Sequence, residues 1–291
     1  MSQERITTLL TEKRSYLPPE HGKSSAWICG QDEADAICRR ALEDPNDFWG
    51  ARASQLIHWF KRWDKVLEAD EARHKYRWFT GAKLNAAFNC IDRHLISGRR
   101  NKAALIWQGE KEMDVRCFTY QMLYTEVCRV AHALSSLHIN KGDRVALYMP
   151  MIPELVIAML ACARIGAIHT AIFSGYAEGG VRSRIQGSKA KVVITADAAI
   201  RAGKIKPLKA NLDPILEKCP SVAHVVVVNH ADLYDVKMTP NRDIWWHDLI
   251  EDFTLDVDFP CEPMDANDTS CCIPAAAPAS PRASCTPRAA T

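Results

Sequence analysis

The chain has 291 residues, with 37 basic against 35 acidic side chains and a formal net charge of +2 at pH 7. With 47% hydrophobic and 25% charged residues, its composition is that of a soluble globular protein of one or two domains. The balanced charge argues against a nucleic-acid partner and a polybasic membrane anchor, since a nucleic-acid-binding domain is usually strongly basic. Residues 1–16 lack an apolar signal region, and the most apolar stretch, Leu155 to Ala163, is too short to span a bilayer. We therefore expect a cytoplasmic protein of the α/β class.

Eleven cysteines are more than such a protein usually carries. No C-x-x-C pair occurs, and no Cys/His cluster has the spacing of a zinc site, so no metal ligand is predicted. Cys90, Cys128 and Cys162 lie in apolar segments, which favours reduced and buried thiols.

The first third of the chain is predicted to be helical and rich in tryptophan. Residues 31–43 have the period of an amphipathic helix, which Pro45 breaks. Residues 55–110 contain four tryptophans, which we interpret as anchors around a core rather than as a ligand site. Residues 84–95 are predicted to form a second helix. Its polar residues 92–94 are adjacent and do not face one another, so we interpret them as a surface edge rather than as acid–base groups.

From residue 118 onward, helices alternate with short apolar strands. Predicted helices cover 118–139, 153–164, 177–187 and 205–218, and predicted strands cover 144–149, 167–173, 191–197 and 222–228. Gly166 is expected to close the second of these helices. Strands that alternate with helices of this length indicate βαβ units and a mostly parallel sheet covered by helices on both faces. This pattern fixes the fold class and leaves the function open.

Two loops follow predicted strands at the edge where parallel sheets bind ligands. FSGYAEGG (173–180) contains three glycines, which let a ligand approach the backbone closely. TADAAIRAGK (195–204) places Arg201 and Lys204 around Gly203, a compact cationic loop suited to a phosphate group. The alternative for this second loop is a solvated charged turn. His169 falls inside a buried strand pattern and is interpreted as a satisfied core histidine.

Several blocks of the sequence resemble the AMP-forming acetyl-coenzyme A synthetases, members of the adenylate-forming ligases. The longest are KGDRVALYMPMIPELVIAMLACARIGAIHTAIFSGY (141–176), WFTGAKLNAAFNCIDRHL (78–95) and ITADAAIRAGKIKPLK (194–209). DPNDFWG (44–50), DIWWHDLI (243–250) and MDANDTS (264–270) follow the same family order. The resemblance implies the N-terminal part of the large AMP-binding domain of such a ligase.

The resemblance also implies a two-step reaction and its substrates. Acetate attacks the α-phosphate of Mg-ATP to give acetyl-adenylate and diphosphate, and coenzyme A then displaces AMP. Arg201, Ala202, Gly203 and Lys204 match the family loop that contacts the nucleotide end of coenzyme A. Phe173 and Gly175 match a neighbouring segment of that pocket, where Ser174 replaces a family glycine and adds a side chain. No residue is predicted to be a catalytic acid, base or nucleophile, and the oligomeric state stays open.

The C-terminal end departs from the family. The family continues into a Gly/Ser/Thr-rich loop with a lysine that cradles the ATP phosphates. Here residues 270–291 read SCCIPAAAPASPRASCTPRAAT, without glycine, lysine or carboxylate. Reading the family sequence TSGSTGKPKGV one nucleotide later in GC-rich codons gives a string that matches PAAAPASPRA (274–283). We therefore expect a disordered, frameshifted tail.

We expect four segments along the chain. They are an irregular segment 1–30, a helical Trp-rich region 31–110, a first βαβ subdomain 111–269 and the tail 270–291. Three interpretations remain: the N-terminal part of an acetate–CoA ligase that is inactive by itself, a non-catalytic remnant that binds coenzyme A or a partner, and a pseudogene product.

Overall fold

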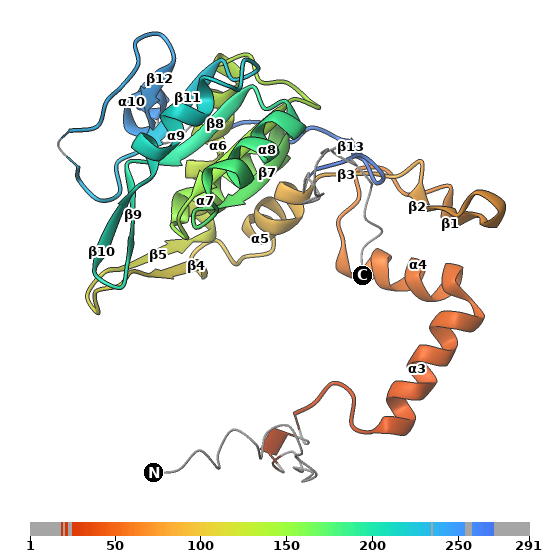
Figure 1. The fold of residues 1–291 in the computed structure, drawn as a ribbon. Coiled ribbons are helices and arrows are strands. Elements are labelled where there is room, and N and C mark those ends of the chain that lie inside the picture. Colours follow the sequence, from red (N-terminus) through yellow and green to blue (C-terminus); the bar gives the residue numbers. More distant parts are fainter. Residues whose placement is uncertain (1–18, 20, 23–24, 234, 254–257, 271–291) are drawn as a thin grey trace, which may run out of the picture. The chain divides into compact units, whose positions relative to one another are not determined.

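The computed structural model describes residues 19, 21–22, 25–233, 235–253 and 258–270 (Figure 1). It divides the chain into two compact units, Met1–Ala53 and Ser54–Thr291. Most of the predicted irregular segment 1–30, and the predicted tail after Ser270, lie outside the described residues.

The first unit contains α3 (Gln31–Glu43) and the beginning of α4 (Pro45–Leu56). The predicted helix 31–43 is confirmed, and Asp32 and Glu33 lie in its first turn, where the helix dipole favours negative charge. Pro45 ends this helix and also opens the next one, because proline is well suited to a first helical turn. The Asp44 carboxylate caps α4 by accepting a hydrogen bond from the Asp47 amide at 2.9 Å.

A five-stranded parallel sheet forms the centre of the second unit, with strand order β12-β11-β8-β6-β7. Its strands are β6 (Arg144–Met149), β7 (Ile168–Phe173), β8 (Val192–Ala196), β11 (His224–Val228) and β12 (Asp243–Trp245). Four of these, β6, β7, β8 and β11, are the predicted strands. β6 has the predicted bounds, and the other three are one or two residues shorter than predicted. Continuous apolar runs predict such strands correctly, because both faces of a parallel sheet are covered and residues on both faces of a strand are buried.

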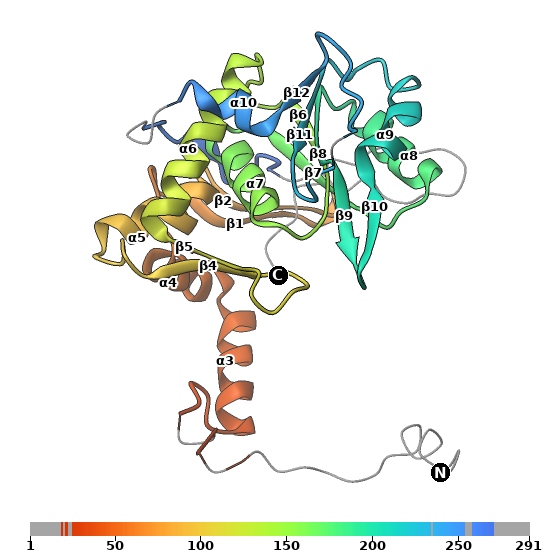
Figure 2. The same ribbon diagram turned by 90° about the vertical axis from the view of Figure 1, so that its left-hand side faces the viewer.

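Helices cover both faces of this sheet. On one face α6 (Tyr120–Ser136) packs against α7 (Pro153–Ile165) and α10 (Trp246–Glu251). On the other face α8 (Glu178–Ser188) packs against α9 (Leu208–Leu216), as Figure 2 shows. Gly166 ends α7 in the left-handed region at φ 74°, as predicted. The predicted α/β class with a helix-covered parallel sheet is thus confirmed.

Four two-stranded antiparallel ladders surround the sheet. They are β1 (Lys65–Asp70) with β2 (Lys75–Thr80), β3 (Lys83–Leu84) with β13 (Met264–Asp265), β4 (Ala103–Gln108) with β5 (Val115–Thr119), and β9 (Ala198–Arg201) with β10 (Lys204–Pro207). The turn between β1 and β2 contains the 3₁₀ segment Glu71–Arg73.

The segment predicted as a helix over 84–95 is more irregular. Leu84 belongs to β3, a π-helical turn spans Phe88–Asp92, and α5 is the short helix Arg93–Ile96. The interpretation of residue 92 as part of a surface edge is wrong. The Asp92 carboxylate accepts two hydrogen bonds from Arg164 on α7, at 2.8 and 2.9 Å, and the Arg164 side chain is only 1% exposed. The position of Asp92 is set by a partner 72 residues away along the chain, which a local sequence pattern does not reveal.

Eight cysteines lie in the described ranges, and all of them are free. Cys128 and Cys162 are buried as predicted, whereas Cys90 is exposed, which corrects its assignment to the interior. Burial raises the pKa of Cys162 to about 12, so this thiol stays protonated. Among the described residues, no helix combines the length and the apolar character needed to cross a membrane.

Candidate functional site

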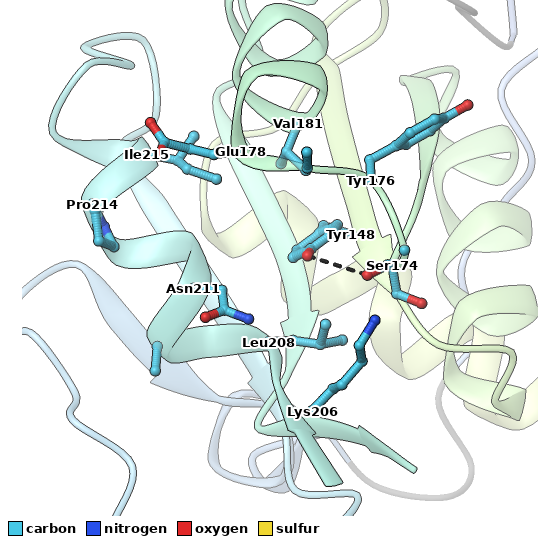
Figure 3. Close-up of a pocket in the computed structure, with 13 residues that line it drawn as sticks. Tyr148, Ser174, Tyr176, Glu178, Val181, Lys206, Leu208, Asn211, Pro214 and Ile215 are labelled. Atoms are coloured by element: carbon cyan, nitrogen blue, oxygen red, sulfur yellow. Dashed lines mark hydrogen bonds between the residues drawn. The ribbon is translucent and has the colours of Figure 1, made fainter. Parts of the chain in front are cut away.

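The strand order creates a crevice at the carboxyl end of β6. After β6 the chain adds β7 on one side and then returns to place β8 on the other side. At such a reversal the two following loops diverge, and ligands of parallel sheets bind there. A pocket of about 390 Å³ lies at this edge (Figure 3). Its walls come from the end of β6, the loop after β7, the first turn of α8, the end of β10 and one face of α9.

The polar groups of the pocket come from three segments. The Tyr148 hydroxyl, at the end of β6, donates to the Ser174 carbonyl over 3.4 Å. Burial raises the pKa of Tyr148, so this hydroxyl remains a hydrogen-bond donor. Figure 3 shows the Lys206 amine extending toward Ser174, and Asn211 facing the pocket from α9. Within the described residues, no carboxylate pairs with Lys206. The pocket therefore offers one cation, several neutral polar groups and one carboxylate, that of Glu178, which pairs with Arg182 at 3.2 Å.

Of the two residues predicted on the loop after β7, one lines the pocket. Gly175 lies in its wall, whereas Phe173 does not line it and is 56% exposed, with its ring edge-on to Tyr176. A Cβ added to Gly175 would approach a ring carbon of Phe173 to 2.4 Å, far inside van der Waals contact. Glycine at 175 thus lets the Phe173 ring lie against the backbone.

The predicted cationic loop 195–204 is a hairpin arm rather than an irregular loop. β9 and β10 pair in register, with Arg201 opposite Lys204, and the turn consists of Ala202 and Gly203. Both turn residues have positive φ, 52° and 69°, the geometry of tight hairpin turns. Alternation along a strand puts Lys204 and Lys206 on the same face of β10, the face that also carries Arg201. The arm therefore presents three cations on one side.

The opposed cations of the hairpin repel each other, and a bound anion would offset this repulsion. Two like charges directly opposite each other on a hairpin destabilise it. Arg201 and Lys204 occupy such a pair, and both are exposed. A phosphate group between or beside them would turn repulsion into attraction, which favours phosphate binding over a merely solvated turn.

The structure places the predicted residues in two adjoining locations. Gly175 lies in the pocket, and the residues predicted from 201 to 204 form the tip of the arm. Lys206 connects the two, because it belongs to the arm and lines the pocket. Lys206, Tyr148 and Asn211 are absent from the sequence prediction. The alternation of lysines at 204 and 206 could have pointed to Lys206. It does so only when the segment is known to be a strand, because alternate residues of a strand then share one face.

The base of the arm is fixed by a buried carboxylate. Asp197 follows β8 and accepts hydrogen bonds from the amides of Ala198, His230, Ala231 and Leu233, at distances from 2.6 to 3.2 Å. Four backbone donors on one carboxylate tie the start of β9 to the loop after β11.

We predict that Asp197→Asn lowers the free energy of unfolding by about 2 kcal/mol, because the new amide NH₂ faces backbone donors and cannot accept from them. Urea denaturation at pH 7 measures this. Asp232→Asn is the matched control, since it makes the same chemical change in an exposed position of the same loop and is expected to cost below about 0.5 kcal/mol. Equal losses in the two variants would contradict the prediction.

His169 lies near the start of β7, at the opposite end of the strand from the pocket. It is buried as predicted, and burial lowers its pKa to about 4, so the imidazole is neutral at pH 7. Its Nδ1 has no hydrogen-bond partner among the described residues, which corrects its description as a satisfied core histidine. Among the described residues, no group of three or more His, Cys, Asp or Glu side chains is placed to hold a metal ion.

Comparison with known proteins identifies the family of the chain. A family model described as AMP-binding enzyme matches residues 92–274, and one described as Acetyl-coenzyme A synthetase N-terminus matches residues 34–90. An acetyl-coenzyme A synthetase of Alkalilimnicola ehrlichii is 41% identical over 259 residues, which cover 89% of this chain and 39% of that protein. An acetyl-coenzyme A synthetase of Gemmatimonas aurantiaca is 46% identical over 270 residues, covering 90% of this chain and 39% of that protein. Acetyl-coenzyme A synthetase 2 of Pseudomonas putida is 46% identical over 232 residues, which cover 80% of this chain and 35% of that protein.

The chain thus spans between a third and two fifths of the length of these relatives. The AMP-binding model covers more than half of the chain, and its match includes the whole parallel sheet and the pocket at its carboxyl edge. The chain belongs to the AMP-binding enzyme family.

Proposed function

We propose that the pocket and the β9–β10 arm bind the nucleotide end of coenzyme A, as part of an acetate–CoA ligase that forms acetyl-adenylate from acetate and Mg-ATP. One observation carries the proposal: Arg201, Lys204 and Lys206 share a face of the arm that ends at the pocket. The phosphates of coenzyme A are the group that such a cationic face recognises. The Tyr148 hydroxyl and the Asn211 amide supply neutral hydrogen-bonding groups within the same pocket.

The remaining parts of this proposal rest on the resemblance. We propose that residues 111–269 form a first subdomain of the AMP-binding domain, preceded by a synthetase-specific region 31–110. The family matches over 34–90 and 92–274 support a division in this part of the chain, with a boundary about 20 residues earlier. The substrates acetate, ATP and coenzyme A are small molecules of the cytoplasm, where we place the protein. We assign no residue of this chain to magnesium.

Titration calorimetry with coenzyme A tests the binding site. We expect binding by the wild-type protein, weaker binding of dephospho-coenzyme A, and an affinity loss of about tenfold for Arg201→Ala and for Lys206→Ala, because each removes one charge-assisted contact. Lys75→Ala is the control, since Lys75 is an exposed lysine of a different hairpin, β1–β2. Folded wild-type protein that gives no binding heat would refute the proposal, as would an Arg201→Ala variant that binds unchanged.

We further propose that residues 1–291 by themselves do not carry out the adenylation step. Stabilising charge on a transferring phosphate requires positioned backbone donors together with a cation or a metal. Residues 270–291 contain two arginines but no glycine, lysine or carboxylate, so they lack the residues of the family's phosphate loop. ATP–pyrophosphate exchange in the presence of acetate is expected to stay at background. Exchange above background would overturn this statement and leave the coenzyme A site unaffected.

A further inference from the structure

The tip of the arm is in contact with a carboxylate from another hairpin. Glu110 lies in the connection between β4 and β5, and its Oε2 accepts a hydrogen bond from the Gly203 amide at 2.8 Å. Its Oε1 accepts from the Ala202 amide. Figures 1 and 2 both show the ends of the β4–β5 and β9–β10 hairpins side by side. One carboxylate therefore occupies both amide donors of the turn.

The position of Glu110 is built into its own loop. The loop closes through a hydrogen bond from the Gly109 amide to the Asp114 carbonyl at 2.7 Å. The side-chain amide of Gln108 donates to carbonyls of the same loop, that of Lys111 at 2.8 Å among them. Next to the loop, the Trp107 indole donates to the Met151 carbonyl at 2.7 Å. These bonds order the backbone that carries Glu110, and its carboxylate contacts the turn through the two amide hydrogen bonds.

The turn has the geometry of an anion site. Two successive backbone N–H groups in left-handed residues point toward one acceptor, which makes a concavity that binds anions. The flanking Arg201 and Lys204 add positive charge to the same tip. Glu110 fills the concavity with a charge of the same sign as a phosphate, and it also lowers the positive potential felt by any anion that approaches.

We propose that Glu110 is an internal competitor for the anion site of the arm, and that a phosphate-bearing ligand binds the tip by displacing its carboxylate. The proposal rests on the function proposed above for the arm and extends it by a residue that sets the affinity. While the site is empty of ligand, Glu110 satisfies the two turn amides and offsets the repulsion between the opposed cations. When the ligand arrives, a phosphate takes over both roles and the Glu110 side chain turns to solvent.

The test compares wild type with Glu110→Gln and uses adenosine 3′,5′-bisphosphate as the probe. Removing one negative charge a few ångströms from a solvent-exposed phosphate is expected to tighten binding about threefold at low salt. The gain is expected to shrink as salt rises, because exposed charges are screened. Glu112→Gln is the matched control: it removes the same charge from the same loop, and the turn amides do not contact its side chain.

A second readout does not depend on any ligand. Amide exchange measured by NMR is expected to be faster at Ala202 and Gly203 in Glu110→Gln than in wild type, and unchanged in Glu112→Gln, because Glu110 is the acceptor of these two amides among the described residues. Tighter binding together with faster exchange supports the proposal. An unchanged or weaker affinity of Glu110→Gln for the bisphosphate would overturn it while leaving the arm as a binding site. If neither wild type nor Glu110→Gln binds, the site itself is refuted along with the competition.

Discussion

Replacement of Asp92 by asparagine is expected to lower the free energy of unfolding by about 3 kcal/mol, because it leaves a buried guanidinium with only the exposed Asp258 carboxylate, 3.8 Å away, as a counter-charge. Arg164 is 1% exposed, and Asp92 binds it through two hydrogen bonds. The Phe259 carbonyl accepts a third, and the Tyr124 ring lies 4.9 Å from the guanidinium carbon. Burial alone would lower the pKa of Arg164, and the bonds from Asp92 more than offset it, so the pKa lies above its ordinary value and the charge is retained.

Urea denaturation at pH 7 measures this loss as a lower midpoint with an unchanged slope. The control is Arg182→Gln, which breaks an exposed i,i+4 pair with Glu178 on α8 and is expected to cost below about 1 kcal/mol. The double variant Asp92→Leu/Arg164→Leu removes both charges and is expected to be more stable than Asp92→Asn, because no unpaired charge remains. A loss for Asp92→Asn no larger than that of the control would show that the pair does not hold the structure together.

The second large effect is expected at Asp243, a fully buried carboxylate on β12. Its two oxygens contact Lys209 at 2.8 Å and Arg242 at 2.6 Å, and the Thr239 amide donates to it at 2.7 Å. Lys209 is itself 2% exposed and also pairs with Asp213 at 2.8 Å. We predict that Asp243→Asn costs about 3 kcal/mol at pH 7, since two cations lose a shared counter-charge inside the protein.

The same group predicts a pH dependence. Burial by itself raises the pKa of Asp243, but the hydrogen bonds from Arg242 and Lys209 outweigh it, so the folded-state pKa lies below the ordinary value. A carboxyl group with a depressed pKa stabilises the fold above its unfolded pKa of about 3.9, and this contribution is lost as the pH falls through the folded-state value. The difference in unfolding free energy between wild type and Asp243→Asn is therefore expected to be constant above about pH 5 and to shrink below about pH 4.

Asp248→Asn provides the control for both measurements, because Asp248 is an exposed aspartate of the adjacent helix α10. It is expected to change stability below about 0.5 kcal/mol at pH 7. A stability difference for Asp243→Asn that stays the same from pH 7 to pH 3 would contradict the assigned ionisation.

The two buried ion clusters explain how distant segments are joined in the second unit. Arg164 links the turn at Asp92 and the segment at Phe259 to α7. Asn85 adds to this link by donating to the carbonyls of Ala163 and Glu262 at 2.8 and 2.9 Å. Lys209 connects α9 with β12, next to the arm and the pocket. The Lys209 cluster lies beside the candidate site, whereas the Arg164 cluster lies at the C-terminal end of α7, away from the pocket.

The local sequence determined the parallel sheet and most of its helices. Apolar runs such as 144–149 and 191–197 are long enough for a strand and too short for a separate helix, and the glycine at 166 ends α7 because it adopts positive φ at little cost. The resemblance of the same blocks to the synthetases also predicts that Gly175 and residues 201–204 contact coenzyme A.

Only the tertiary structure decided how those residues are presented. Residues 198–207 contain a run of small and charged side chains that reads as a loop, and they form a hairpin because two left-handed residues close the turn and Asp197 anchors its base. That register puts Lys206 in the pocket and Glu110 on the turn. The roles of Asp92 and Glu110 depend on partners 72 and 93 residues away along the chain, and sequence periodicity reports only neighbours within a few residues.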